Sequence, residues 1–465
     1  MTASPDDRTV AHALAAFAVA DAPVPDDVRD RLGLHLLDVV GCGIAAVGAG
    51  VAGHASALAS AQGGAPEASL IGASERVPAA LAAFANGTRC HGLDFDDTHE
   101  VGICHASAVV GPAALAVGER RGRSGGDVLD AYVRGCEVAV RIATVFADGA
   151  YARGFHPTGV CGAFGAAAAA ARLEGLDERL TLAALGVAGS LASGLLEYLS
   201  DGSATKPIHA GWAAQAGVQA VLLAASGAAG PTRVIEGEFG LLASHGARPD
   251  DAGAIVDELG ERWEAAAMSI KAFPACHFAH ASTWAAAETV ATHGLRPDDI
   301  AAIVVRIPHA GEQMVLDPIE AKHHPRTPYD AKFSLPFTVA HHIVRGGLGL
   351  DAFSEASIAD PDVLALARRV AAEPLGPADG TVSRFGGGAR TITRDGRELD
   401  RLLPHAPGSP GNPLDEAAVL AKFRDNAALA LPPERAETLA DALRTIASSA
   451  SLAAIADPLS RSRPR

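Results

Sequence analysis

The chain has 465 residues, 49% of them hydrophobic, so it can bury a large core and is expected to divide into about two or three domains. A formal net charge of -16 at pH 7 argues against nucleic acid and against an anionic membrane surface as partners. Aromatic residues make up only 5% of the chain, whereas its 50 glycines and many alanines favour closely packed helices. We therefore expect a mainly α-helical protein.

The six cysteines are scattered and form no CxxC pair, so the sequence indicates neither a zinc ribbon nor a thioredoxin-like site. Reduced, mostly buried thiols are typical of cytoplasmic proteins. Residues 1–8 are acidic and polar, unlike a signal peptide, and the longest apolar run, Val39–Gly53, is shorter than the roughly 18 to 20 residues that span a bilayer. We expect a cytoplasmic protein with no role in membranes.

The first predicted helix begins after Pro25, where Asp26 and Asp27 favour a helix N-terminus. Apolar residues then recur at helical spacing, at Val28, Leu32, Leu36 and Val40. Further apolar segments of helical length, separated by Gly, Asp or Pro, span residues 79–84, 108–117, 127–146, 162–173, 180–199 and 211–225. Together they predict a large all-helical domain whose first part is residues 1–270.

The pattern changes after Pro274. Residues 301–308 are rich in β-branched side chains, as a strand should be, and residues 381–385, 390–394 and 397–399 read as further strands, with a turn at Asp395-Gly396. Helical stretches at 333–345 and 361–370 lie between them. We expect a smaller α+β lid domain over residues 271–404. A linker rich in Pro and Gly then leads into residues 405–465, which are predicted to return to the helical domain.

The densest polar cluster is the run GLDFDDTH, residues 92–99, followed by His105. It places three carboxylates, a hydroxyl and two imidazoles between two apolar helical segments, where polar groups must be satisfied internally or used in function. Four more loops carry His, Lys or Tyr among small residues at the start of helices. They span residues 154–159, 202–211, 271–280 and 329–334.

Each of these features also has a structural explanation. Asp94, Asp96 and Asp97 are suited to cap a helix near Thr98, and a single His at a helix start is more often a cap or a satisfied core group than a catalyst. Lys206 is as compatible with a solvated surface as with a site. Asp, His and Cys also occur together near residues 94–105, but their spacing matches no tight set of metal ligands, so we expect no metal and no other cofactor.

Taken together, the loops supply proton carriers and cations at His105, His156, Lys206, Lys271, His277 and Tyr329, with Asp94 and Thr98 to orient them. This set suits abstraction of a proton next to a carboxylate, because the enolate that forms needs cations and hydrogen-bond donors where its charge develops. A small polycarboxylate would be held by several Lys, His, Ser and Thr contacts. The predicted substrate is therefore a small carboxylate anion.

An ordered series of motifs resembles the MmgE/PrpD family, which includes 2-methylcitrate dehydratase, cis-aconitate decarboxylase and iminodisuccinate epimerase. The motifs are LDFDDTH, HASAVVGPAALAV, FHPTGVCGAFGAAAAAA, GSATKPIHAGWAAQAG, IKAFPACHFAH, YDAKFSLPF and PGSPGNPLDEAAVLAKF. They extend from about Leu32 to Phe423 in the right order. The resemblance implies a helical domain built from both chain ends, a smaller α+β lid, a homodimer and a metal-free pocket.

Carried over by motif, the resemblance implies catalytic roles for His105, Lys206, His156, Asp94 and Tyr329. It implies substrate-binding roles for Thr98, Lys271, His277 and Ser203. The match is looser at His277, where Cys276 and His280 compete for the same role, and at Tyr329, whose loop varies among members. A further departure is His105-Ala106-Ser107-Ala108-Val109, where classical 2-methylcitrate dehydratases resemble HPSDN.

The sequence is thus interpreted as a cofactor-independent lyase of a small di- or tricarboxylate, with dehydration as the first choice of reaction. In that reaction His105 or Lys206 takes the α-proton, and His156 or Tyr329 protonates the leaving hydroxyl. Decarboxylation of an aconitate-like substrate and epimerisation of an iminodisuccinate-like compound are the alternatives. A catalytically inactive binding dimer is the alternative from a different class.

Overall fold

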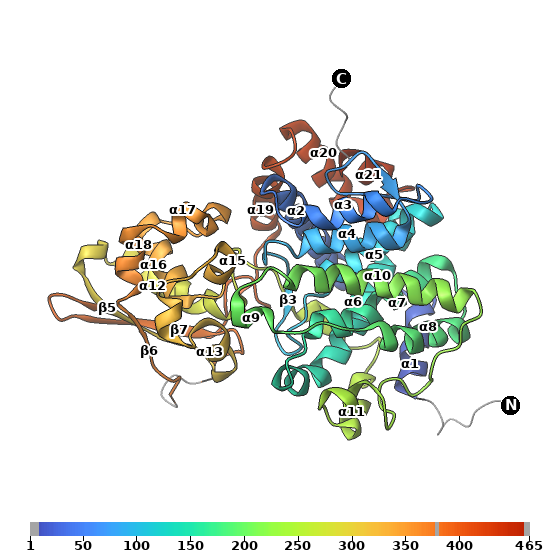
Figure 1. Ribbon diagram of the computed structural model, residues 1–465, viewed down its shortest axis with the longest axis horizontal. Helices are drawn as coiled ribbons and strands as arrows, with labels where there is room; N and C mark the ends of the chain where they lie inside the picture. The colour runs from blue at the N-terminus through green and yellow to red at the C-terminus, as the bar shows by residue number, and fades with distance from the viewer. Residues whose placement is uncertain (1–8, 377–380, 460–465) are drawn as a thin grey trace. The chain divides into compact units, whose positions relative to one another are not determined.

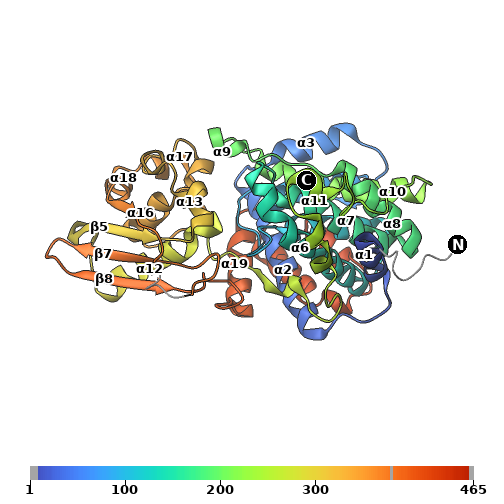
Figure 2. The same cartoon turned by 90° about the horizontal axis from the view of Figure 1, so that it is seen from below.

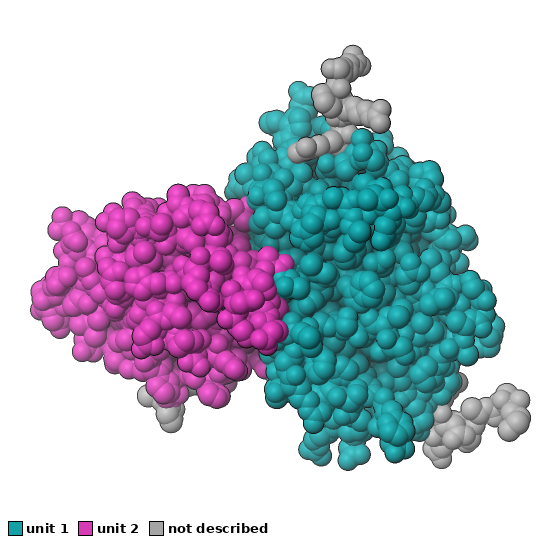
Figure 3. Space-filling view, in the orientation of Figure 1, with its two compact units in different colours: residues 1–196, 205–268, 415–465 teal, residues 197–204, 269–414 magenta. Residues whose placement is uncertain are grey.

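The computed structural model describes residues 9–376 and 381–459, which form two compact units (Figure 3). The larger unit comprises residues 1–196, 205–268 and 415–465, and the smaller one residues 197–204 and 269–414. The larger unit is therefore assembled from both ends of the chain. The mainly helical fold class predicted from the sequence is confirmed.

Helices are the main elements of the larger unit (Figure 1). In its first segment they are α1 (Val10–Val19), α2 (Asp26–Gly48), α3 (Gly53–Gln62), α4 (Ala79–Cys90), α5 (Ala106–Arg121), α6 (Gly125–Ala152), α7 (Pro157–Glu174) and α8 (Glu178–Leu191). The later segments add α10 (Lys206–Ala225), α11 (Leu241–His245), α19 (Glu416–Ala428), α20 (Pro433–Arg444) and α21 (Ala453–Leu459). Short strands β1 (Ala68–Ser69), β2 (Arg76–Val77) and β3 (Thr98–His99) show that the unit is not entirely helical.

Local sequence explains where these helices begin. Ser124 and Asp127 form a reciprocal capping box at the start of α6, and the Asp177 side chain caps α8. The sequence did not predict α1. It also extended the helix at 180–199 too far, because residues 192–197 leave the helix at the extended Ala192.

The centre of the larger unit is built from α4, α5, α6, α7 and α10, which pack against one another in pairs. Glycines allow the backbones of these helices to approach one another closely, as the composition predicted. A Cβ atom at Gly211 of α10 would lie 2.3 Å from the carbonyl oxygen of Phe84 on α4, and one at Gly217 would lie 2.6 Å from the backbone nitrogen of Ala167 on α7. The site described below rests on this rigid core.

The smaller unit contains a four-stranded sheet in the order β6-β5-β7-β8. Its strands are β5 (Ile300–Arg306), β6 (Val370–Ala372), β7 (Gly387–Thr393) and β8 (Glu398–Leu403), and β4 (Met268–Ser269) lies at the boundary between the units. The helices of the unit are α9 (Tyr198–Asp201), α12 (His280–Thr292), α13 (His309–Val315), α14 (Ile319–Lys322), α15 (Pro328–Ala331), α16 (Leu335–Arg345), α17 (Glu355–Ile358) and α18 (Pro361–Ala367). Figure 2 shows α12 alongside β7 and β8, against which it packs.

The predicted turn at Asp395-Gly396 is present, with Gly396 at φ 87°, and it joins the antiparallel strands β7 and β8. The strand expected at 381–385 is wrong, because this segment forms a loop and a turn before β7 begins at Gly387. Phe385 is buried there and stacks on His277, so its apolar character reflects packing rather than sheet formation.

The unit boundaries differ from those expected in three places, the smallest difference being residues 269 and 270, which belong to the smaller unit. Residues 197–204 belong to the smaller unit, although they were assigned to the helical domain, and the smaller unit continues to residue 414 rather than 404. The Pro/Gly-rich linker that follows residue 404 is held in the smaller unit by a backbone hydrogen bond. The Ile270 N–H donates to the carbonyl oxygen of Gly408, in this linker, at 3.0 Å. Chain composition alone did not reveal this pairing.

Among the described residues, one helix, α2, is long and apolar enough to cross a membrane by length and composition, but 72% of its apolar window is buried inside the protein. Core helices of globular proteins meet the same criterion. All six cysteines are buried and free of disulfides, as expected.

The close approach of α10 and α4 predicts the effect of one added methyl group. In Gly211→Ala the new Cβ would lie 2.1 Å from the Thr88 hydroxyl, so one helix must move, at a cost of about 1–3 kcal/mol of unfolding free energy. Gly33→Ala on α2 is the matched control, because a Cβ there meets nothing within 4 Å. We expect Gly33→Ala to be neutral or stabilising. Thermal unfolding checks both, and equal melting temperatures for the two variants would contradict the packing described.

Candidate active site

Three of the predicted catalytic residues lie at the N-terminal ends of three helices in the core of the larger unit. His105 is the N-cap of α5, His156 is the N-cap of α7, and Lys206 is the first residue of α10. Helix N-termini carry partial positive charge and exposed N–H groups, so this arrangement suits an anionic ligand. All three side chains are buried or nearly so.

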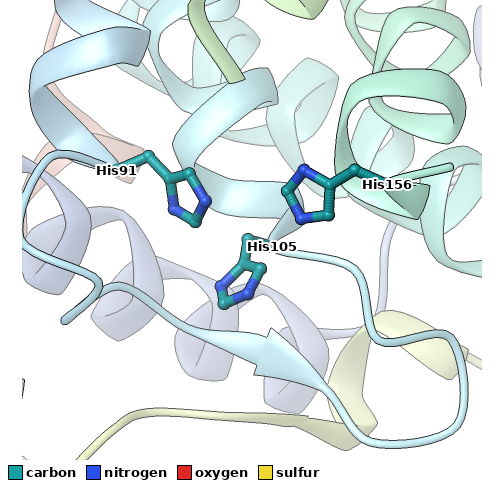
Figure 4. Close-up of side chains that lie close together, drawn as sticks. All are labelled: His91, His105 and His156. Carbon is teal, nitrogen blue, oxygen red and sulfur yellow. The ribbon is translucent and has the colours of Figure 1, made fainter. Parts of the chain in front are cut away.

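A fourth side chain, His91, joins them from the C-terminal end of α4. Figure 4 shows the rings of His91, His105 and His156 pointing toward one another. The His91 ring centroid lies 4.6 Å from that of His105 and 6.0 Å from that of His156. His91 Nε2 is buried and has no hydrogen-bond partner among the residues that the structure describes, so it is available to a ligand.

The Asp96 carboxylate contacts two of these imidazoles, His91 and His105. It accepts hydrogen bonds from His91 Nδ1 at 2.8 and 2.9 Å, and His105 Nδ1 lies 3.3 Å from Asp96 Oδ2. Burial by itself would raise the pKa of Asp96, but the two imidazoles outweigh it and hold that pKa below its ordinary value. Asp96 is therefore a carboxylate that orients both rings.

Asp97 fixes His105 through its backbone. The Asp97 carbonyl oxygen lies 2.6 Å from His105 Nδ1, and because a carbonyl only accepts, this nitrogen must carry the proton. The Asp97 side chain is held in turn by His35 Nδ1 at 2.7 Å and by the Ser107 hydroxyl. Tyr132 donates to Ser107 at 2.5 Å, which completes a buried network behind His105.

The protonation state of His105 follows from these contacts. Burial, reinforced by the nearby Lys206 charge, lowers the pKa of His105 to about 4. The ring is then neutral near pH 7, with its proton on Nδ1 and a lone pair on Nε2. A neutral imidazole held in this tautomer can accept a proton at Nε2.

His156 is paired with a histidine of α10. Its Nδ1 lies 3.1 Å from His209 Nδ1, so one ring donates and the other accepts. Burial lowers the pKa of His156 well below its ordinary value, and the neighbouring His209 and Lys206 lower it further. Burial likewise lowers the pKa of His209 to about 4. Both rings are neutral near pH 7 when no ligand is bound.

Lys206 supplies the positive charge of this group. Its Nζ contacts Asp94 Oδ1 in a buried ion pair. Asp94 has a φ of 54°, a left-handed conformation that Asp tolerates better than most residues. Asp94 is therefore placed to orient Lys206, and its catalytic role stays a prediction. Thr98 is also buried, in β3, close in sequence to these groups.

The remaining predicted residues belong to the smaller unit. Lys271 and His277 are buried there, and Tyr329 is half-buried in α15. Ser203 is exposed, in the turn after α9. Of the histidines that compete for one role, His280 donates from Nε2 to the Ala275 carbonyl at 3.2 Å and stacks on Phe273, and His277 stacks on Phe385. The role of His277 stays a prediction.

Sequence reasoning missed His91, Asp96 as an orienting group, His209 and His35. Periodicity gave no reason to single out a histidine that ends one helix or lies inside another. The available signal was spacing: His91 precedes Asp96 by five residues, and His209 follows Lys206 by one turn of helix. The helix-cap explanation holds for Asp97, whose Oδ1 accepts from the Ser107 N–H in the first turn of α5 at 3.3 Å and which also accepts from His35. Asp96 instead accepts hydrogen bonds from a histidine ring.

In the part of the chain that the structure describes, two groups of side chains have ligand atoms close enough to share a metal ion, within 4.8 Å of one another. They are His91, His105 and His156, and His91, Asp94 and Asp96. A metal ion bound there would face the ammonium group of Lys206, which already lowers the pKa of His105 and His156. The metal-free site stays a prediction, which chelation tests.

Two family models match the chain in succession. Residues 9–251 match the MmgE/PrpD N-terminal domain, and residues 273–447 match the MmgE/PrpD C-terminal domain. The chain belongs to the MmgE/PrpD family. The resemblance stated from the motifs is thereby confirmed.

Several curated relatives in this family are named cis-aconitate decarboxylases. The chain is 31% identical to the Homo sapiens enzyme over 64% of its own length and 62% of that relative. It is 27% identical to the Mus musculus enzyme over 78% of the chain and 75% of the relative. For the Aspergillus terreus enzyme the identity is 28%, over 56% of each.

The buried neutral histidines predict how stability depends on pH. His99, His105 and His209 have pKa values of about 4 because of burial, against an ordinary value of 6.5, so between these values the unfolded chain binds more protons than the folded one. Stability then rises with pH in this window, and the melting temperature should fall as pH drops from 7 to 4.5. Asp38, whose pKa burial raises to about 6, works in the opposite direction but is outnumbered.

The control for this dependence is His209→Asn, which removes one of the titrating groups and should flatten the curve. Thermal melts at half-unit intervals of pH measure it. A wild-type melting temperature that rises on acidification would contradict neutral histidines in the site.

Chelation tests the metal prediction. Dialysis against EDTA should leave catalytic activity unchanged, because Lys206 opposes a second cation and the Nδ1 atoms of His91 and His105 already donate to Asp96 and Asp97. The measurement is turnover before and after dialysis, with metal content determined in parallel. Loss of activity that returns with one added metal would refute the prediction.

Proposed function

We propose that this protein is a cofactor-independent carboxy-lyase that decarboxylates cis-aconitate or a close unsaturated tricarboxylate. The observation that carries the proposal is His105, held as a neutral ring with Nε2 available, in a buried group with Lys206 at converging helix N-termini. The names of the relatives support decarboxylation over dehydration, which was the first choice from sequence.

The reaction requires one proton and a means of stabilising negative charge. The bond between the CH₂ carbon and its carboxylate breaks, carbon dioxide leaves, and the electron pair forms a new terminal double bond. The pair of the original double bond moves to the neighbouring CH carbon, where the adjacent carboxylate delocalises it, and that carbon takes up a proton. The product is itaconate, and one proton is consumed per turnover.

The side chains of the larger unit match these needs. Lys206, oriented by Asp94, is the cation that stabilises the carboxylate bearing the developing charge. Binding of a trianion favours protonation of His105 Nε2, because opposite charges stabilise the imidazolium form. His105 then delivers the proton to the CH carbon. We propose that Thr98, Lys271 and His277 contact the substrate carboxylates, as the family resemblance implies.

Proton NMR in D₂O tests the proposal against its alternatives. The purified protein is incubated with cis-aconitate, citrate, 2-methylcitrate and iminodisuccinate in separate tubes. We expect itaconate from cis-aconitate, with one deuterium in its CH₂ group. An olefinic product from a hydroxy acid would replace decarboxylation by dehydration, exchange of a C–H without a new double bond would indicate epimerisation, and no change in any tube would favour an inactive binding protein.

Two substitutions test the assigned groups. Lys206→Met and His105→Gln should each lower kcat by about 10²-fold or more, since each removes charge stabilisation or proton transfer from the transition state. The control is His54→Gln, because His54 is exposed on α3 and outside the site. Turnover of cis-aconitate and the melting temperature are measured together. Full activity in a folded Lys206→Met or His105→Gln variant would refute that assignment.

A further inference from the structure

The last of the matched motifs, PGSPGNPLDEAAVLAKF, has no role in the site described so far. Its final residues, Lys422 and Phe423, lie on α19, more than three hundred residues after the GLDFDDTH loop. This helix packs against α2 within the larger unit (Figure 1). The motif is therefore brought next to the loop by folding rather than by sequence.

Two glycines of α2 set how closely α19 approaches. A Cβ at Gly41 would lie 2.9 Å from Phe423 Cδ2, and one at Gly48 would lie 2.4 Å from the Leu429 carbonyl oxygen. The glycines are seven residues apart and so lie on one face of α2. The position of Lys422 on α19 is consequently fixed by backbone packing, which makes its contacts reproducible.

From this position Lys422 contacts both Phe95 and Asp38. Its Nζ donates to the Phe95 carbonyl oxygen at 2.8 Å and lies 2.7 Å from Asp38 Oδ1 of α2. Nζ also lies 3.8 Å from the centroid of the Phe95 ring, in cation–π geometry. The side chain is only 8% exposed and that of Asp38 is fully buried.

The residue that Lys422 holds is flanked by two groups of the active site. Asp94, which pairs with Lys206, precedes Phe95, and Asp96, which orients His91 and His105, follows it. Asp94 is in the left-handed region at φ 54°, so this part of the loop needs external support to keep its shape. Lys422 supplies such support, because it contacts both the carbonyl oxygen and the ring of Phe95.

We propose that Lys422 is a positioning residue for the active-site loop, acting on Asp94 and Asp96 through the carbonyl and ring of Phe95. The inference rests on the proposed function, because it concerns the same side chains. It assigns the C-terminal segment a part in catalysis without contact with substrate. A displacement of the loop by about 1 Å is enough to lower turnover by about 10²-fold.

The competing explanation is that Lys422 serves only to neutralise the buried Asp38. Removing one partner of a buried ion pair leaves an uncompensated charge and destabilises the fold, whereas removing both charges does not. The two explanations therefore differ in the double variant Asp38→Asn/Lys422→Met. This variant has lost both charges of the Asp38–Lys422 pair, so neither is left uncompensated, but it still lacks the donor to Phe95.

The experiment measures kcat, KM and melting temperature for Lys422→Met, for the double variant and for Arg424→Met. Arg424, two residues further along α19, forms an exposed ion pair with Glu437 and serves as the matched control. We expect Lys422→Met to lower both the melting temperature and kcat. In the double variant the melting temperature should recover while kcat stays about 10²-fold low, with a smaller change in KM.

Hydrogen exchange measured by mass spectrometry reports directly on the conformational stability of the loop at residues 92–99. Peptides covering residues 92–99 should exchange faster in the double variant than in wild type, while the rest of the larger unit is unchanged. Recovery of kcat together with melting temperature, or normal exchange of the loop, would overturn the proposal. If Lys422→Met does not fold, the double variant alone decides.

Failure of the proposed function can be distinguished from failure of the Lys422 proposal. If wild type turns over none of the four substrates, the carboxy-lyase assignment fails and the kinetic comparison has no basis. The exchange of residues 92–99 in the double variant still tests whether Lys422 holds the loop.

Discussion

Three carboxylates buried within four residues of one loop impose the arrangement on which the site depends. Asp94, Asp96 and Asp97 are all inaccessible to solvent, and a buried carboxylate is tolerated only when it is paired and hydrogen-bonded. Each therefore needs a cation or a donor from another part of the larger unit. The partners are Lys206, His91, His105, His35 and Ser107, from four different helices or their ends. Several of the side chains suited to catalysis are thus the same ones that make the loop stable.

This arrangement also explains why the site suits an anion. His105 and His156 are neutral before a ligand binds, because burial and the charge of Lys206 lower the pKa of each ring. A polycarboxylate reverses that balance and draws a proton onto the rings when it arrives. In the decarboxylation that we propose, which consumes one proton per turnover, proton supply would then be coupled to substrate binding.

The sequence predicted most of this fold because Gly-rich helices and β-branched strands leave clear patterns, as α10 and β5 illustrate. His105, His156 and Lys206 were predicted because polar residues at helix starts between apolar segments are conspicuous. His91, His209 and Lys422 were missed because their significance arises from contacts between distant segments. The Phe385 segment was mistaken for a strand because packing and sheet formation select the same side chains. A homodimer and a cytoplasmic location stay predictions.

The central claim is that His105 is a neutral imidazole with its proton on Nδ1 and its Nε2 free to exchange a proton with substrate. Nitrogen-15 NMR of histidine-labelled protein at pH 7 tests it most directly, with His105→Gln to assign the signals. The account predicts one protonated nitrogen, Nδ1, and one unprotonated nitrogen, Nε2, for His105, and a shift toward imidazolium on adding a non-reactive tricarboxylate. A proton on Nε2 alone, or a charged ring in the free protein, would contradict it.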